Sequence, residues 1–192
     1  MSHIQLQTLV GFREPHRKLS YDEISPETTR AMADFAKAIR EAKRILEEFG
    51  FEAPPINPVT IARDLGVQVT FVKLPPQYQS VSGFYDSADD AIFVNKAEHP
   101  RRMTFTIAHE LGHRVLHREW SASNDYRVLM RDQSLLTVDP KEQEANAFAA
   151  HLLVPTKMLA NYRDIASTEE LSKLFAVSMP VIRNRLKREF NS

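Results

Sequence analysis

The stretch from Phe105 to Leu116 places ionisable side chains inside an otherwise apolar run, and it constrains the fold more than any other part of the sequence. Apolar residues surround His109, Glu110 and His113, which predicts a buried helix rather than a solvent-exposed one. Histidines four residues apart lie one above the other on one face of a helix, so both imidazoles can reach a single ion. Buried histidines need polar partners, and a metal ion is one such partner.

The spacing of these residues is that of a zinc site. In the pattern His-Glu-x-x-His the two histidines bind the metal, and the glutamate lies beside the first of them. An ionised Glu110 can accept a proton from water on the metal without binding the metal itself. The same pattern also occurs by chance as two surface histidines on an amphipathic helix. The rest of the sequence therefore has to distinguish the two interpretations.

Composition narrows the metal chemistry and the class of protein. The 192 residues include no cysteine, which excludes disulfides and thiolate ligands and leaves histidine and carboxylate as ligands for zinc. Lysine plus arginine equal aspartate plus glutamate, 25 against 25, so the overall charge favours neither nucleic acid nor an anionic membrane. The segment from Met1 to Lys18 lacks the apolar core of a signal peptide, and no stretch approaches the roughly 18 apolar residues of a membrane helix. We expect a cytoplasmic protein.

Hydrophobic periodicity and turn residues predict a helical N-terminal part followed by a small sheet. An arm from Met1 to about Ser25 is interrupted by glycine and proline and has no clear period. The elements that follow are a helix over 26–49 closed by Gly50, a helix over 58–65 closed by Gly66, a strand over 67–72 and a hairpin over 81–95. The hairpin and the preceding strand together make a sheet of about three strands.

The predicted sheet lies directly before the motif helix, which the pattern places over 103–120. A sheet edge in that position can bind an extended peptide through main-chain hydrogen bonds, although a sheet that only packs on the helix fits the sequence equally well. Gly112 costs roughly 1 kcal/mol relative to alanine inside a helix. Its presence indicates that a strand or a substrate backbone approaches the helix closely at that point.

A catalytic zinc site needs a third protein ligand besides the two histidines. The downstream candidates are His117, Glu119, Glu142, Glu144 and His151. On a straight helix His117 lies about 12 Å along the axis from His109, so it is predicted to be a packing histidine or one that supports a ligand. Glu142 belongs to a second predicted helix, which begins at Pro140 and has small residues that allow close packing on the motif helix. We predict that Glu142 is the third ligand.

The second helix also predicts a residue that supports the ligands. Asn146 lies one helical turn after Glu142 on the same face, where it can hydrogen-bond a ligand imidazole and fix its orientation. Glu144 points about 200° away from Glu142 by helical rotation. We therefore expect Glu144 to face solvent.

Two separated motifs, taken together, resemble the ImmA/IrrE family of metallo-endopeptidases. The first runs from Phe105 to His117 and includes the sequence His-Glu-Leu-Gly-His, and the second runs from Glu142 to Pro155. The residues 83–85 and 92–95 of the hairpin and the pair Arg101-Arg102 are also similar to the family. The resemblance covers roughly residues 58–155, about half of the chain.

The resemblance implies both a fold and an activity. The fold is α+β, a small zincin-like core of the gluzincin type in which a short mixed sheet of about three strands packs on the motif helix. One zinc ion per chain is held by His109, His113 and Glu142, with Glu110 as the general base for peptide-bond hydrolysis. Members of the family cleave a cytoplasmic helix-turn-helix repressor and so relieve repression of stress-response or mobile-element genes. The implied partner is a protein substrate of that kind.

The chain departs from the family pattern at two positions. His151 stands where the family commonly has an acidic or polar residue, and it could alter the substrate cleft or add a titrating group. Val154 replaces a frequent methionine. Neither change removes a predicted ligand. The residues up to about Gly50 contain no motif of the family.

After Pro155 the chain becomes helical and locally basic. Two short helices are predicted within 169–190, with a break near Val177 and Ser178 capping the second helix. Five basic residues against one acidic residue from Lys173 to Ser192 give a local charge of +4. This is a helix-turn-helix-like signal, but the turn lacks glycine and a single such unit reads DNA weakly. We expect a docking or packing role, with a DNA-binding or partner-binding regulator that retains a vestigial protease core as the alternative function.

The sequence predicts three parts: an N-terminal arm and long helix over 1–50, a zinc metallopeptidase domain over 51–160 and a helical segment over 161–192. A polar segment from Ser121 to Asp139 is long for a connection in a compact domain, and such segments are often binding elements or lids. An oxyanion donor is also expected, and Tyr85, Tyr126 or an arginine could serve. Sequence alone does not choose among these donors.

Overall fold

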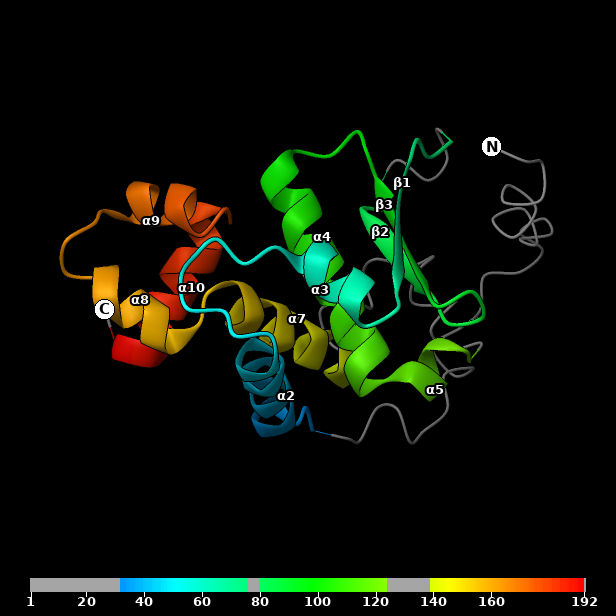
Figure 1. The fold of residues 1–192 in the computed structure, drawn as a ribbon, viewed down its shortest axis with the longest axis horizontal. Helices are drawn as coiled ribbons and strands as arrows, with labels where there is room; N and C mark the ends of the chain where they lie inside the picture. The colour runs from blue at the N-terminus through cyan, green and yellow to red at the C-terminus, as the bar shows by residue number, and fades with distance from the viewer. Residues whose placement is uncertain (1–31, 76–79, 124–138, 192) are drawn as a thin grey trace. The chain divides into compact units, whose positions relative to one another are not determined.

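The computed structural model describes residues 32–75, 80–123 and 139–191 (Figure 1). In chain order the elements are α2 (Phe35–Glu48), α3 (Pro58–Asp64), β1 (Gln68–Val72), β2 (Gly83–Asp86), β3 (Ala91–Asn95), α4 (Pro100–Leu116), α5 (Arg118–Ser121), α7 (Pro140–Leu153), α8 (Thr156–Tyr162), α9 (Thr168–Leu174) and α10 (Met179–Phe190). This arrangement confirms the predicted α+β class. The predictions for the N-terminal arm, for Tyr126 and for most of the segment 121–139 fall outside the described residues. No helix in the described ranges is long and apolar enough to cross a membrane.

The three strands form one mixed sheet in the order β1-β3-β2. The central strand β3 pairs in parallel with β1 and antiparallel with β2, which confirms the hairpin and the sheet of about three strands. All five residues of β3 are buried, as expected for a short apolar strand with neighbours on both sides. Within the described part of the chain, β1 and β2 each pair only with β3 and are therefore edge strands.

The motif helix α4 packs against the sheet through β2 and β3 and against α7 on its other side. It begins at Pro100, three residues before the predicted start, because the side chain of His99 accepts a hydrogen bond from Arg101 N and caps the helix. It ends at Leu116 rather than at Trp120. His117 has non-helical backbone angles and separates α4 from the short helix α5.

The close approach predicted at Gly112 is present, but the neighbour is a helix rather than a strand or a substrate. A Cβ atom on Gly112 would lie 3.2 Å from the Cα atom of Ala145 and 3.1 Å from Cδ1 of Phe148, both on α7. Ala145 and Phe148 are fully buried. The absence of a side chain at Gly112 therefore sets how closely the two helices of the site can pack.

The N-terminal helix is shorter than predicted. Asp34 accepts a hydrogen bond from Lys37 N and caps α2, so the helix begins at Phe35 instead of Pro26, and residues 32–34 are not helical. Its end agrees with the prediction, since Gly50 follows the helix with a φ of 65°. The helix packs on α7, on which α4 also packs.

The predicted pair of C-terminal helices is confirmed as α9 and α10. The left-handed position between them is occupied by Ala176, with a φ of 54°, which explains how the turn forms without glycine. Ser178 is at the N-cap position of α10, but its side chain makes no capping hydrogen bond. Arg185 of α10 is buried and donates hydrogen bonds to the Val154 carbonyl oxygen and to Oγ1 of Thr156. These bonds attach α10 to the end of α7 and the start of α8.

Replacing Gly112 with alanine tests the close packing of α4 and α7. At an open helical position the change would stabilise the protein by about 1 kcal/mol. Here the added methyl group meets backbone atoms of α7, so we expect the free energy of unfolding to fall by roughly 1–3 kcal/mol, measured by urea denaturation. Ala36→Gly at an exposed position of α2 reports the helix-propensity effect alone. A Gly112→Ala protein that is more stable than the parent would contradict the close approach.

Candidate metal centre

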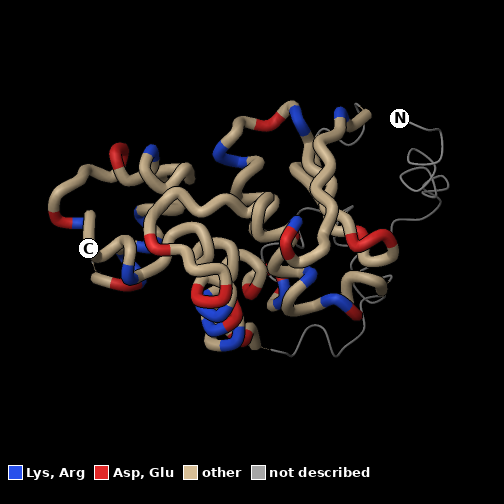
Figure 2. The backbone as a smooth tube through the Cα atoms, viewed as in Figure 1, with Lys and Arg blue, Asp and Glu red and all other residues tan. Residues whose placement is uncertain are grey.

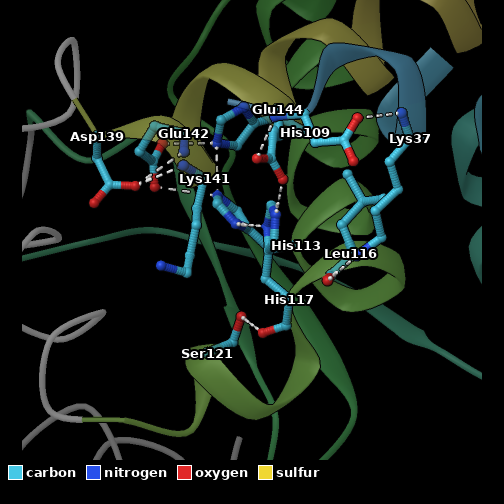
Figure 3. Close-up of polar contacts among 11 residues, drawn as sticks. Lys37, His109, His113, Leu116, His117, Ser121, Asp139, Lys141, Glu142 and Glu144 are labelled. Carbon is cyan, nitrogen blue, oxygen red and sulfur yellow. Dashed lines mark hydrogen bonds and ion pairs between the residues drawn. The ribbon is translucent and has the colours of Figure 1, made fainter. Parts of the chain in front are cut away.

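Three side chains from two helices converge on one point (Figure 3). Nε2 of His109 lies 3.1 Å from Oε2 of Glu142, and Nε2 of His113 lies 3.1 Å from Oε1 of the same carboxylate. The two Nε2 atoms are 3.0 Å apart. Within the described residues these three side chains form the group whose donor atoms could hold a metal ion, all within 4.8 Å of one another. The structure thus brings together the three residues that the sequence nominated as ligands.

Local helix geometry explains this convergence. His109 and His113 are one turn apart on α4, and the helix points both imidazoles toward α7. Glu142 is in the first turn of α7, where Asp139 caps the helix by accepting hydrogen bonds from Lys141 N and Glu142 N. The cap fixes where α7 begins and therefore where the Glu142 carboxylate lies.

The electrostatics of this point favour a cation. Burial lowers the pKa of His109, but the hydrogen bond with Glu142 and the charge of Glu110 outweigh it and raise the pKa to about 9. Burial raises the pKa of Glu142, and hydrogen bonds from His109 and His113 more than compensate, so that this pKa lies well below its usual range. Two carboxylates thus attract positive charge to a point surrounded by donor atoms. Two imidazoles and one carboxylate are also the donor set of many catalytic zinc sites.

Asn146 lies where the sequence predicted it. Its Oδ1 atom is 3.1 Å from Nδ1 of His109, on the side of the ring opposite the convergence point. Because an amide oxygen accepts, Nδ1 of His109 donates to Asn146, and the proton on Nε2, which faces Glu142, is the one that a bound metal ion would displace. Glu110 follows His109 on α4 and is buried, 5% exposed, so a carboxylate lies next to the converging group as the motif predicts.

Glu144 does not face solvent, and that prediction was wrong. Its carboxylate is buried, accepts a hydrogen bond from Asp34 N at 2.8 Å and lies 2.7 Å from Nε2 of His117. The reason is tertiary packing: α2 and the end of α4 cover the face of α7 that helical rotation assigns to Glu144. His117 in turn lies 3.3 Å from His113, ring nitrogen Nδ1 to Nδ1. As predicted, it contacts a candidate ligand without joining the group of three.

The remaining candidates lie elsewhere. Glu119 is exposed on α5. His151 lies at the contact between α7 and α10, 2.8 Å from Nη1 of Arg185. Burial lowers the pKa of His151 to about 4. The hydroxyl of Tyr85 is buried and donates to Asp90 at 2.8 Å, and burial raises its pKa to about 12, which makes Tyr85 a poor oxyanion donor.

Sequence reasoning missed Trp120, which packs beside the centre. Its ring centroid is 5.5 Å from that of His113 and 6.0 Å from that of His117. The ammonium group of Lys141 lies 5.0 Å from the centroid of the indole ring, at cation–π distance. The available signal was that Trp120 is the only tryptophan of the chain and follows His117 by three residues.

Comparison with known sequences agrees with this geometry. A sequence model of the peptidase M78 family, described as an IrrE N-terminal-like domain, matches residues 62–187. The chain belongs to this family. The resemblance to ImmA/IrrE metallopeptidases is thereby confirmed, and the fold around the three converging side chains is that of a metallopeptidase family.

Individual relatives are more distant. The chain is 31% identical over 114 residues to uncharacterized immunity region protein 2 of Bacillus phage phi105, which covers 58% of this chain and 67% of that protein. It is 32% identical over 96 residues to metallopeptidase ImmA of Bacillus subtilis strain 168, covering 48% of this chain and 54% of ImmA. The matched part of this chain therefore spans about two thirds of the length of the phage protein and about half of the length of ImmA.

One solved structure, a Mycobacterium tuberculosis transcriptional regulator, has a TM-score of 0.58 at 19% identity. The match covers 79% of this chain and 47% of that one. At this identity the likeness supports the fold alone.

Removing the Glu142 carboxylate tests the candidate metal centre. We expect Glu142→Ala to lose nearly all bound zinc, because two imidazoles alone would remain, as measured by elemental analysis of the purified full chain. Glu119→Ala, which removes an exposed carboxylate close by in the sequence, should keep the zinc content of the parent protein. Full zinc content in Glu142→Ala would refute the ligand assignment.

Proposed function

We propose that this protein is a zinc-dependent endopeptidase in which His109, His113 and Glu142 hold the metal and Glu110 is the general base. The observation that carries the proposal is the convergence of three donor atoms within 4.8 Å inside a metallopeptidase fold. Zinc is favoured among metals because the donors are two imidazoles and a carboxylate, a set typical of catalytic zinc. The absence of cysteine is consistent with this choice.

The chain's own residues would perform the proton transfers. Zinc held at this point would supply a Lewis acid that activates a water molecule and polarises the scissile carbonyl. Glu110 would accept the proton of the attacking water and return it to the leaving amine as the peptide C–N bond breaks. Glu110 is buried beside His109, so its carboxylate is kept out of bulk solvent. In this less polar environment its charge acts more strongly on the reacting groups than it would in water. Asn146 would hold His109 in the orientation that binding requires.

We further propose that the substrate is a cytoplasmic regulatory protein, to be sought among the helix-turn-helix repressors encoded near this gene. One relative is named an immunity region protein of a Bacillus phage and another a metallopeptidase, and the resemblance to ImmA/IrrE metallopeptidases implies a repressor as the substrate. An extended segment of the substrate could add to the β2 edge, because β2 is the edge strand that packs on α4. Chelator-sensitive cleavage of the repressor encoded by the neighbouring reading frame, co-expressed with this chain, would support the assignment.

The alternative function, a DNA-binding regulator, rests on the basic C-terminal segment. Of its five basic residues, Arg185 is buried and Lys173 pairs with Glu169 at 2.7 Å. Figure 2 shows acidic residues among the basic ones along α9 and α10. A salt-sensitive gel shift by the full chain would favour this alternative, and we expect none at physiological salt.

Replacing Glu110 with glutamine separates catalysis from metal binding. The amide is isosteric with the carboxylate but cannot accept the proton of the attacking water. We expect Glu110→Gln to retain zinc by elemental analysis and to cleave the co-expressed repressor roughly 10²–10⁴-fold more slowly than the parent. Undiminished proteolysis in this variant would exclude Glu110 as the general base.

Arg185 and Arg183 form a matched pair for testing the role of α10. Arg185→Met removes a buried guanidinium and leaves the Val154 carbonyl oxygen and Thr156 without their donor. We expect a loss of roughly 1–3 kcal/mol in the free energy of unfolding. Arg183→Met removes an exposed charge and should change stability by less than about 0.5 kcal/mol. Equal stability of the two variants would mean that α10 is not anchored through Arg185.

A further inference from the structure

A continuous chain of hydrogen bonds leads from Asp34, the residue that caps α2, to a candidate metal ligand; Figure 3 labels its three side chains. Asp34 N donates to Oε1 of Glu144 at 2.8 Å, Oε2 of Glu144 lies 2.7 Å from Nε2 of His117, and Nδ1 of His117 lies 3.3 Å from Nδ1 of His113. The three side chains of this chain are buried, and His113 is only 1% exposed. Buried polar groups in such a chain must all be satisfied together, since each unpaired group would be costly.

The direction of every bond in the chain follows from its first donor. A backbone N–H can only donate, so Glu144 accepts from Asp34 and acts as a carboxylate acceptor for His117 as well. Nε2 of His117 therefore carries a proton, and in the neutral ring Nδ1 is the acceptor. His113 must then donate from its own Nδ1. Nε2 of His113, which lies 3.1 Å from Oε1 of Glu142, is then the ring nitrogen whose lone pair a zinc ion would take in place of a proton.

We propose that His117 and Glu144 are positioning residues that hold His113 in the tautomer and orientation needed to bind zinc. The inference rests on the proposed metal site and extends it to two residues outside the group of ligands. Asn146 holds His109 in the same way, through a direct hydrogen bond with its Nδ1 atom. His113 is instead held through two residues, His117 and Glu144, and this relay of hydrogen bonds ends on the backbone N–H of Asp34, which caps α2.

The fold explains why this relay can form. The helix α4 ends at Leu116, so His117 has backbone angles of −136° and 28° rather than helical ones, and its ring can turn back toward His113. Glu142 and Glu144 leave α7 in different directions. One reaches the convergence point itself, and the other reaches His117 on the far side of His113. Two side chains of α7 thus fix the His113 ring: Glu142 contacts its Nε2 atom directly, and Glu144 holds its Nδ1 atom through His117.

Zinc affinity of the full chain provides the first test, measured by competition with a chromophoric chelator. His117→Phe keeps a ring of similar size but cannot accept from His113 or donate to Glu144. We expect it to bind zinc about 10–100-fold more weakly than the parent. His117→Gln offers an amide oxygen and an amide N–H in their place and should recover most of the affinity. His151→Phe replaces another hydrogen-bonded histidine, which is half-buried and lies at the contact with α10, and should leave the affinity unchanged.

The proton positions provide a second test, which needs no variant to fold. In the zinc-loaded parent protein, two-bond proton–nitrogen NMR spectra should show His113 protonated on Nδ1 and His117 protonated on Nε2. A purely structural role for His117 would not require this pairing of tautomers. A zinc-loaded protein with His117 protonated on Nδ1 would overturn the relay.

The outcomes separate this inference from the proposed function. A parent chain that binds no zinc would overturn the metal site and, with it, the relay. A parent that binds zinc together with a His117→Phe variant that binds it equally tightly would overturn only the positioning role. Weak binding by His117→Phe and restored binding by His117→Gln, with unchanged binding by His151→Phe, would support the relay.

Discussion

The close contact between α4 and α7 is the constraint on which the candidate site depends. Glu142 reaches the two histidines across the interface between the helices, and Gly112 lets these helices approach to backbone distance at Ala145. Glycine inside a helix lowers stability by roughly 1 kcal/mol, and the sheet, α2 and α3 pack around the two helices. The rest of the described fold therefore serves to hold one short interhelical distance.

That contact also concentrates charge in the interior, which a protein tolerates only when every group has a partner. Glu110, Glu142 and Glu144 are all buried beside histidines. Burial of carboxylates without compensation would cost several kcal/mol each. Positive charge at the centre therefore compensates Glu110 and Glu142, whereas Glu144 is satisfied by Asp34 N and His117. The same reasoning explains why His117 is neutral: burial lowers its pKa to about 4, although its hydrogen bond with Glu144 opposes the change. The candidate metal centre therefore favours a cation. The relay beside it consists of hydrogen bonds that join Asp34 N, Glu144, His117 and His113.

Features set by local geometry were predictable from sequence, and those set by distant packing were not. The spacing of His109 and His113, the hairpin and the position of Asn146 follow from helical and turn periodicities over a few residues. Helical rotation correctly separated Glu142 from Glu144, but it could not show that the opposite face of α7 is covered. That cover comes from Asp34, 110 residues earlier in the chain. The start of α2 was missed for a related reason, because Asp34 caps the helix and residues 32–34 are not helical.

The C-terminal helices show that a count of charged residues in the sequence is limited in the same way, because it does not tell which side chains are buried. Counting residues gives the segment from Lys173 a charge of +4, which treats every basic side chain as part of one surface. Arg185 instead lies in the interior, bonded to the Val154 carbonyl oxygen and, at 2.6 Å, to Glu189. A guanidinium used in this way cannot contact a phosphate, and it ties α10 to the helix that carries Glu142. Arg101 of α4 makes a similar connection, donating to Ser172 of α9 at 3.0 Å. Both helices of the candidate site are thus bonded to the C-terminal segment, which favours a structural role for that segment over a role as an independent reader of DNA.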